Sequence, residues 1–322
     1  MKRLVMTLLF AVTLLTLTSG WADSTYMVLH YFGDGTDGWA PEAAVVFDGN
    51  GNLYGTTTVG GLGCGSPGCG IVFQLQPNPG GLWPETILHN LNRNEGAMSQ
   101  APVVFDGQGN LYGTTSNGGG GNQGTVFELI RNSAGWTAQV LPAFTGGWDG
   151  GNPYGGMLLD HAGRVYGMTS AGGSNNDGVV FSLNRQSVTV ETALHAFTGG
   201  NEGISPMNAL IADASGNLYG TTYLGGASGA GTVFKLSPNR LGPGWVHTVL
   251  HSFTAIPYGS GSDGANPYAG LVFDAAGNLY GTTFFGGPAG GGTVFKLAPN
   301  GDGTWAESTI YAFQGGADGA NP

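Results

Sequence analysis

The stretch Leu271–Leu297, with the sequence LVFDAAGNLYGTTFFGGPAGGGTVFKL, occurs in related form five times in this chain. The tyrosine of each copy measures the period, because successive tyrosines stand 58, 54, 53 and 61 residues apart. A unit of this length is too long for one coil of a solenoid and suits one blade of a β-propeller. The other copies are Val45–Leu75, Val103–Leu129, Leu158–Leu183 and Leu210–Leu236, and the five tyrosines are Tyr54, Tyr112, Tyr166, Tyr219 and Tyr280.

Each unit contains four candidate strands. In the fifth unit the first strand holds consecutive apolar residues, which is typical of a sheet covered on both faces. An aspartate and a glycine in the following turn supply a backbone acceptor and a positive φ. The pattern predicts an all-β fold of four-stranded antiparallel blades. The four strands of this unit are expected at Ala269–Asp274, Leu279–Thr283, Thr293–Leu297 and Trp305–Phe313.

The strand count is uneven. The chain contains five complete repeats, but Tyr26–Phe32 matches a sixth copy of the fourth strand, and residues 314–322 form a partial linker. Either five blades close with one strand spare, or the polypeptide is truncated from a larger ring. We favour truncation, within a single domain over residues 23–322. The repeats are expected at about residues 34–91, 92–144, 145–197, 198–253 and 254–313.

The N-terminus indicates export. Lys2 and Arg3 precede an apolar run, and small residues end at Ala22, which is typical of a signal peptide over residues 1–22. Cys64 and Cys69 are the only cysteines and lie in one short loop. In an oxidising compartment they are expected to form a disulfide. The sequence therefore predicts a secreted or cell-surface protein without a membrane span after cleavage.

Composition excludes several classes of function. The chain has 9 basic and 20 acidic residues, and removing Lys2 and Arg3 leaves a balance of −13. Such a surface disfavours nucleic acid, whose binding depends on basic clusters. Although 63 residues are glycine, 41% are hydrophobic, so the glycines are interpreted as turn residues of a folded protein. We expect a monomer.

The recurring GNLYGTT…GG…GTVF string resembles the GloVer tandem repeat, found in secreted bacterial proteins with differing C-terminal anchors. The motif is identical at GNLYGTT in four of the five copies, and Arg164–Thr169 is the degenerate one. The resemblance covers nearly the whole chain and implies export and a repeat fold rather than a reaction. The D-x-x-G-N-L-Y hairpin is also similar to the inner hairpin of NHL-type propellers, which implies a strand order from axis to rim.

No catalytic motif stands out. Three GxGxxG matches are expected by chance in a glycine-rich chain, and none opens a helix after a strand. No GxSxG or HExxH motif is present, and no cofactor is predicted. A histidine recurs near the end of the fourth strand, which favours a structural role, whereas two others have no evident partner. The recurring ones are His30, His89, His195 and His251, and the single ones are His161 and His247.

The linkers between repeats carry the candidate ligand-binding residues. With strands alternating in direction, these linkers and the loops after each second strand should emerge on one face, called the loop face here. Two interpretations of the linker acids are open: each acid caps its own turn, which is the preferred interpretation, or the face binds a ligand. Aromatic planes beside amides and carboxylates suit neutral sugars, and the oxygens would also suit calcium. The candidates are Asp37, Trp39, Glu95, Trp148, Asp149, Tyr154, Glu202, Asp263 and Tyr268, beside the amides Asn122, Gln123, Asn175 and Asn176.

Two classes of function remain open. The first is a non-catalytic surface protein that binds glycan or protein ligands, or serves as a spacer. The second is a secreted carbohydrate-active enzyme, a hydrolase or lyase with paired carboxylates on the loop face. Near-identity of the repeats favours the first, because an enzyme should have one or two blades with singular carboxylates or histidines.

Overall fold

The computed structural model describes residues 27–33, 35–184, 192–254 and 261–322. Five four-stranded antiparallel sheets, called blades 1 to 5, follow one another along the chain, with strands in sequence order within each sheet. The blades are β1(Val46–Phe47) β2(Leu53–Thr56) β3(Ile71–Leu75) β4(Glu85–Asn90); β5(Val104–Phe105) β6(Leu111–Thr115) β7(Thr125–Asn132) β8(Gly135–Ala143); β9(Leu158–Leu159) β10(Arg164–Thr169) β11(Val179–Asn184) β12(Thr192–Ala196); β13(Ile211–Ala212) β14(Leu218–Thr222) β15(Thr232–Pro238) β16(Trp245–Ser252); and β18(Val272–Phe273) β19(Leu279–Thr283) β21(Thr293–Pro299) β22(Trp305–Ala312).

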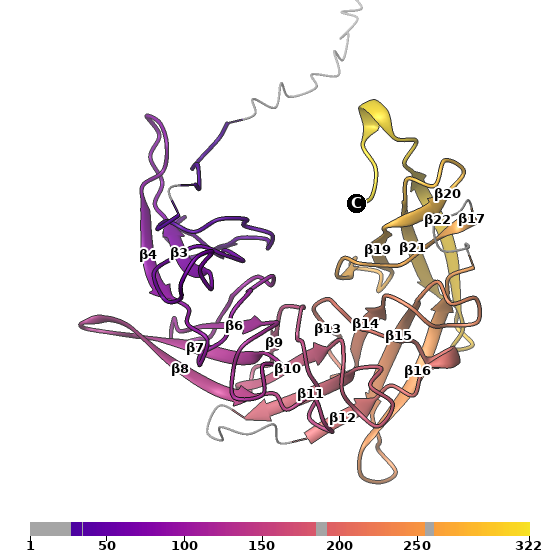
Figure 1. Ribbon diagram of the computed structural model, residues 1–322. Coiled ribbons are helices and arrows are strands. Elements are labelled where there is room, and N and C mark those ends of the chain that lie inside the picture. The colour runs from indigo at the N-terminus through magenta and orange to yellow at the C-terminus, as the bar shows by residue number, and fades with distance from the viewer. Residues whose placement is uncertain (1–26, 34, 185–191, 255–260) are drawn as a thin grey trace, which may run out of the picture.

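The sheets are arranged like the blades of a propeller. Figure 1 shows them side by side around an arc, with short first strands such as β13 toward the centre and fourth strands such as β16 outside. The remaining elements lie in loops and linkers. They are the 3-10 turns η1(Gly200–Glu202) and η2(Gly316–Asp318) and a two-stranded sheet of β17(Gly261–Ala265) and β20(Phe285–Gly287).

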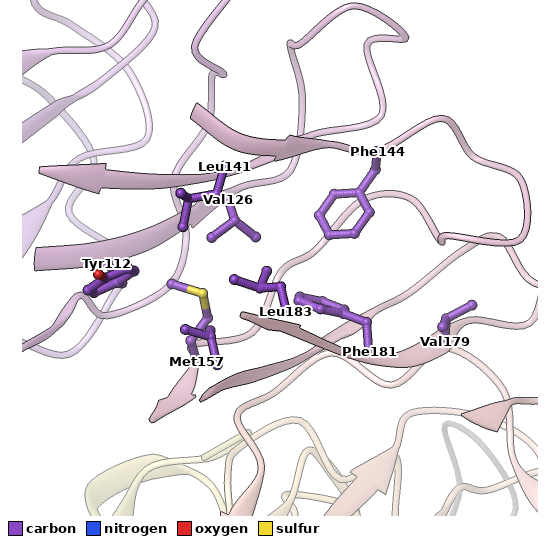
Figure 2. Close-up of a cluster of buried hydrophobic side chains, with 9 residues drawn as sticks. Tyr112, Val126, Leu141, Phe144, Met157, Val179, Phe181 and Leu183 are labelled. Atoms are coloured by element: carbon purple, nitrogen blue, oxygen red, sulfur yellow. The ribbon is translucent and has the colours of Figure 1, made fainter. Parts of the chain in front are cut away.

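Apolar side chains fill the space between neighbouring sheets. Between blades 2 and 3, side chains from both sheets point toward one another and form one buried cluster (Figure 2). Within this cluster the ring centroids of Phe144 and Phe181 lie 5.1 Å apart. Burial on both faces explains why the inner strands carry consecutive apolar residues. The labelled members are Tyr112, Val126, Leu141, Phe144, Met157, Val179, Phe181 and Leu183.

The motif tyrosine packs against the next blade, as the repeats predicted. Tyr219 of blade 4 lies edge-on to Phe273 of blade 5, with ring centroids 5.1 Å apart. The motif tyrosines of blades 1 to 4 are buried, whereas Tyr280 of blade 5 is half-buried. No described sheet covers blade 5 on that side, which explains the difference.

Close contacts between the second and third strands explain why the residues after the motif tyrosine are small. A Cβ on Gly113 would stand 2.2 Å from Phe127 Cζ, so only glycine lets the phenylalanine of the third strand cover the second. The hydroxyl oxygens of Thr115 and Thr125 lie 2.9 Å apart and join the same two strands. Thr115 and Thr125 are register partners, so this contact holds the two strands in register.

The aspartate of each inner turn caps its own hairpin, as predicted. Asp274 accepts bonds from the backbone N–H groups of Ala276 and Asn278 at 2.9 Å. Its second oxygen accepts the Asn278 amide at 2.7 Å and the Tyr280 hydroxyl at 2.9 Å. The bonds from Asn278 hold the pKa of Asp274 at about 2. The D-x-x-G-N-x-Y spacing therefore encodes one turn that links the hairpin to the packing tyrosine.

The N-terminal segment of the chain differs from its prediction. The predicted strand Tyr26–Phe32 is wrong for its described part, since residues 27–33 form no strand. A fourth strand needs the edge of a third strand, and no described strand precedes it. The segment nevertheless packs as a fourth strand would, with Leu29 and Phe32 on the core of blade 1. The predicted signal peptide, residues 1–22, lies outside the described residues.

Predicted and observed strands otherwise differ at their ends. The first strand of blade 5 is only Val272–Phe273, because strong pairing is limited to the two residues opposite Leu279 and Tyr280.

The predicted disulfide is present, with the Cα atoms of Cys64 and Cys69 5.6 Å apart. In the described part of the chain, none of the helices has the length and apolar character needed to cross a bilayer.

Candidate functional site: the loop face and the blade junctions

The linkers and the loops after the second strands meet on one face, as the strand directions predicted. In blade 1, Trp39 of the linker forms a β-bridge with Val59 of the loop. Equivalent bridges join Ala97 to Asn117, Gly151 to Ala171 and Ile204 to Leu224, and in blade 5 the contact extends to the β17–β20 pair. The loop face is therefore built from the same backbone pairing in every blade.

The linker acids act mainly as acceptors in tight turns. Asp149 accepts the Thr145 backbone N–H at 2.9 Å, and Glu202 accepts that of Thr198 at 3.2 Å. Asp37 and Asp263 do the same in their own linkers, from Gly33 and Thr254. Asp149 and Asp263 are only 7% exposed. The turn-capping interpretation therefore fits these four acids.

The four recurring histidines lie near the acids of their turns, and two of them bond to these acids. His89 lies 2.7 Å from Glu95, which is held by this bond rather than by a turn amide, and His251 lies 3.2 Å from Asp263. In blade 5 the tyrosine that replaces histidine takes over the contact, since Tyr311 donates to Asp318 at 2.9 Å. Burial opposes ionisation of Asp263, but bonds from His251 and Thr254 outweigh it and lower the pKa of this carboxyl.

A β-bulge explains how these histidines reach the linker. Between β3 and β4 the register shifts between Val72 and Phe73, so Leu88 is an extra residue on the outer strand. A bulge re-aims the side chains that follow it, here His89. Blades 3, 4 and 5 have the same shift between the corresponding valine and phenylalanine. The sequence showed the recurring histidine but not the bulge, so its partner was not identified.

The aromatic candidates point outward on the loop face, unlike the acids. Trp39 is 61% exposed, Trp148 65% and Tyr268 48%, whereas Tyr154 is half-buried. The Tyr268 ring also contacts Tyr223 edge-on, with centroids 6.0 Å apart. The structure places these rings on three linkers, with Trp148 and Tyr154 on the same one.

The four candidate amides largely serve the loops themselves. Asn122 accepts the backbone N–H of Gly118 at 3.1 Å, and Asn176 accepts that of Gly172 at 2.9 Å. Asn175 donates to the carbonyl of Thr198. Gln123 lies against Gly146 and Gly151 of the neighbouring linker. These residues shape the face more than they extend from it.

One aromatic ring borders a hollow. Trp39 lines a depression of about 460 Å³ whose other walls are the disulfide loop and glycine backbone. Hydrogen bonds from Gly60 to Pro67 and from Gly61 to Gly35 hold this backbone in place. The lining residues are Gly33, Gly35, Trp39, Gly60, Gly61, Ser66, Pro67 and Gly68. An exposed indole beside peptide groups can stack on an apolar ring face and bond hydroxyl groups at its rim.

A group of three side chains at the junction of blades 3 and 4 was not anticipated. His247 of β16 stacks on His195 of β12, with centroids 4.4 Å apart and planes inclined by 2°. His195 Nε2 lies 3.5 Å from a carboxylate oxygen of Glu202. Burial lowers the pKa of His195. Burial also lowers the pKa of His247, to about 4, and the nearby charge of His195 is a second, smaller cause of this shift. His247 had no partner within its own repeat, so sequence reasoning could not place it.

A larger hollow of about 600 Å³ lies at the opposite end of the strands, between the inner turns of blades 3 and 4. Its acids, Asp160 and Asp213, are the turn caps of their own hairpins. His161 is exposed at its edge. Because these acids have structural partners, the hollow offers little chemistry beyond its shape.

Comparison with known proteins gives a family and a fold. The model of the Gloeobacter/Verrucomicrobia repeat matches residues 12–138, 62–261 and 132–322. No curated protein matches the sequence.

Among solved structures, a provisional 6-phosphogluconolactonase from Bacteroides uniformis is similar at 17% identity and a TM-score of 0.50, covering 83% of this chain and 70% of that one. A protein of unknown function from Dyadobacter fermentans is 12% identical, with a TM-score of 0.50 and coverage of 88% and 85%. A thermostable family-43 glycoside hydrolase is 12% identical, with a TM-score of 0.42 and coverage of 88% and 96%. These likenesses concern the fold alone.

Proposed function

Because the chain belongs to the Gloeobacter/Verrucomicrobia repeat family, we propose that it is a secreted or surface-associated, non-catalytic repeat protein that binds carbohydrate through its loop face. The observation that carries this proposal is the hollow at Trp39, where a 61%-exposed indole lies beside backbone fixed by the Cys64–Cys69 loop. Sugars are recognised by stacking on such rings together with hydrogen bonds to nearby polar groups.

The state of the carboxylates supports binding over hydrolysis. Glycoside hydrolysis requires two carboxyl groups that flank the scissile bond and exchange protons with it. Asp149 and Asp263 are buried beneath the face and are occupied by turn amides and hydroxyl groups. Glu95 is bonded to His89. Acids with these structural tasks are poorly placed to act on a ligand above the face.

The predicted signal peptide and the disulfide support an extracellular location, since disulfides persist in oxidising compartments. An export assay with a fused reporter that follows cleavage after Ala22 tests this part. Calcium binding on the loop face stays a prediction, and a calcium titration of the same protein would check it.

Glycan-array screening of the purified protein tests the proposal, alongside assays for release of reducing ends from the polysaccharides that bind. We expect binding to neutral glycans without release of reducing ends. Release that is abolished by Asp149→Asn or Glu95→Gln would instead establish the carbohydrate-active enzyme. Absence of binding across the array would remove the support for a glycan ligand.

A further inference from the structure

His195, Glu202 and His247 bring three metal-ligating groups together across one blade junction. Their ligand atoms, two imidazole nitrogens and one carboxylate oxygen, all lie within 4.8 Å of one another. The three residues come from β12, the linker after it and β16, so only the folded protein assembles them. The group lies apart from the Trp39 hollow and does not depend on the proposed binding of carbohydrate.

The two imidazole nitrogens lack the partners that buried polar atoms normally have. Nε2 of His195 and Nε2 of His247 are both shielded from solvent, and neither forms a hydrogen bond with any described residue. Leaving such atoms unsatisfied is costly, and a bound ion is one of the few explanations for it. Each ring also meets Phe197 edge-on. Because the two imidazole rings lie parallel, one of them must rotate for both Nε2 lone pairs to point at the same ion.

Comparison between junctions shows what His247 adds. It occupies the position on the fourth strand that pairs with the last leucine of the third strand. At the junction of blades 1 and 2 this position is Ala138, and His89 there bonds directly to Glu95 at 2.7 Å. At the junction of blades 3 and 4, where the position is a histidine, the corresponding contact from His195 to Glu202 opens to 3.5 Å. At this junction the third ligating residue therefore lies beside a longer contact between histidine and carboxylate.

The contact between the N-terminal segment 27–33 and blade 1 has the same pattern. There the position is Glu85, and His30 Nε2 lies 4.0 Å from Asp37 and 3.9 Å from Glu85. Its three ligand atoms also lie within 4.8 Å of one another. At the junction of blades 4 and 5 the equivalent position is Glu307, but His251 there bonds to Asp263 at 3.2 Å, and these three residues are not among the three-ligand groups of the described residues. A third ligating residue at this position is therefore necessary but not sufficient for the cluster.

We propose that His195, Glu202 and His247 form a binding site for a divalent transition-metal ion, with Zn²⁺ as the ion that fits the donor set best. Zinc takes histidine nitrogens and carboxylate oxygens at about 2.0–2.2 Å in a tetrahedron, which separates ligand atoms by about 3.4 Å. The Glu202 side chain is 37% exposed and can move toward the two rings. Its exposure also leaves a fourth position to water. The site ties two blades together through their outer strands.

Zn²⁺ titration by calorimetry tests the site, using protein without a polyhistidine tag and with Co²⁺ absorption as an independent readout. His247→Phe keeps a ring against His195 but removes the nitrogen, and Glu202→Gln keeps an acceptor for Thr198. His89→Phe is the matched control, because that junction has only two ligating groups. We expect both site variants to weaken binding of one equivalent by at least about tenfold, since even outer-shell losses cost that much.

The control should bind as the unmodified protein does. A second equivalent that is lost in His30→Phe would extend the proposal to the equivalent junction. The proposal is overturned if the unmodified protein binds neither Zn²⁺ nor Co²⁺, or if His247→Phe and Glu202→Gln bind the same number of equivalents with the same affinity.

Discussion

The imidazole rings of His195 and His247 lie parallel, with centroids 4.4 Å apart, although 52 positions of sequence separate them. Each blade alone would leave its histidine on the sheet surface, and only the packing of blades 3 and 4 brings the two rings together. The contact departs from strict repetition, because the position of His247 is Ala138 in blade 2 and Glu307 in blade 5.

The contact predicts a pH dependence of stability. An unfolded histidine has a pKa of about 6.5, whereas burial, followed by the charge of His195, lowers the pKa of His247 to about 4 in the folded protein. Between these values the unfolded chain binds the extra proton, so the free energy of unfolding falls as pH decreases from 6.5 toward 4. We expect this residue to account for about 1–3 kcal/mol of that loss.

Urea unfolding in the presence of a chelator, at about pH 7.5 and about pH 4.5, measures this contribution. His247→Phe should lose less stability than the unmodified protein over the same interval. Equal losses in the two proteins would show that His247 titrates normally.

The motif tyrosines offer a test of blade packing. Tyr219 is 4% exposed and lies under blade 5, so Tyr219→Ala should cost about 3–5 kcal/mol of unfolding free energy. Tyr280 has the same place in its repeat but is half-buried, and Tyr280→Ala should cost clearly less. Chemical denaturation of both variants provides the comparison, and equal costs would contradict packing between blades as the role of this residue.

The requirement for glycine after the motif tyrosine can be tested in the same way. A Cβ on Gly113 would meet the Phe127 ring at 2.2 Å, so Gly113→Ala should destabilise the protein by about 1–3 kcal/mol or more. Gly107 has open space around its Cβ position and no positive φ, which makes Gly107→Ala a matched control. Thermal melts of the two variants check this, and a tolerated Gly113→Ala would mean that the phenylalanine can move aside.

The disulfide should matter for both stability and binding. Closing a loop of six residues reduces the conformational entropy of the unfolded chain, which stabilises the folded protein by about 2 kcal/mol. Replacing Cys64 and Cys69 together by serine should remove up to that amount and loosen the wall of the Trp39 hollow. Melting temperature and glycan affinity measure the two effects separately. A double variant with unchanged affinity would show that the loop plays no part in the binding surface.

Much of the fold could be predicted from the sequence, because the signals are local and repeated. The spacing of Asp274, Gly277 and Tyr280 encodes one capped hairpin, and the same spacing in other repeats predicts the same turn. Strand Leu279–Thr283 was predicted exactly for this reason. The loop face also follows from strand direction alone. These features depend only on residues that are close in sequence and on the alternating direction of successive strands.

The junction contacts could not be predicted in the same way. The partner of His89 depends on a bulge at Leu88, and a one-residue register shift leaves no clear sign in the sequence. The stacking of His247 on His195 depends on how two sheets pack, which periodicity does not describe. The linker acids were ambiguous for a related reason, since a carboxylate that caps a turn and one that binds a ligand occupy the same motif.

The most direct test of the central claim is the affinity of the protein for a glycan found on the array, measured by calorimetry for the unmodified protein and for Trp39→Ala. Leu62→Ala is the control, because Leu62 is 73% exposed two residues before the disulfide loop but does not line the hollow. A ring at the centre of a binding site contributes about 2 kcal/mol or more, so Trp39→Ala should weaken binding about 30-fold while Leu62→Ala leaves it unchanged. Equal affinities of Trp39→Ala and the unmodified protein would contradict the account.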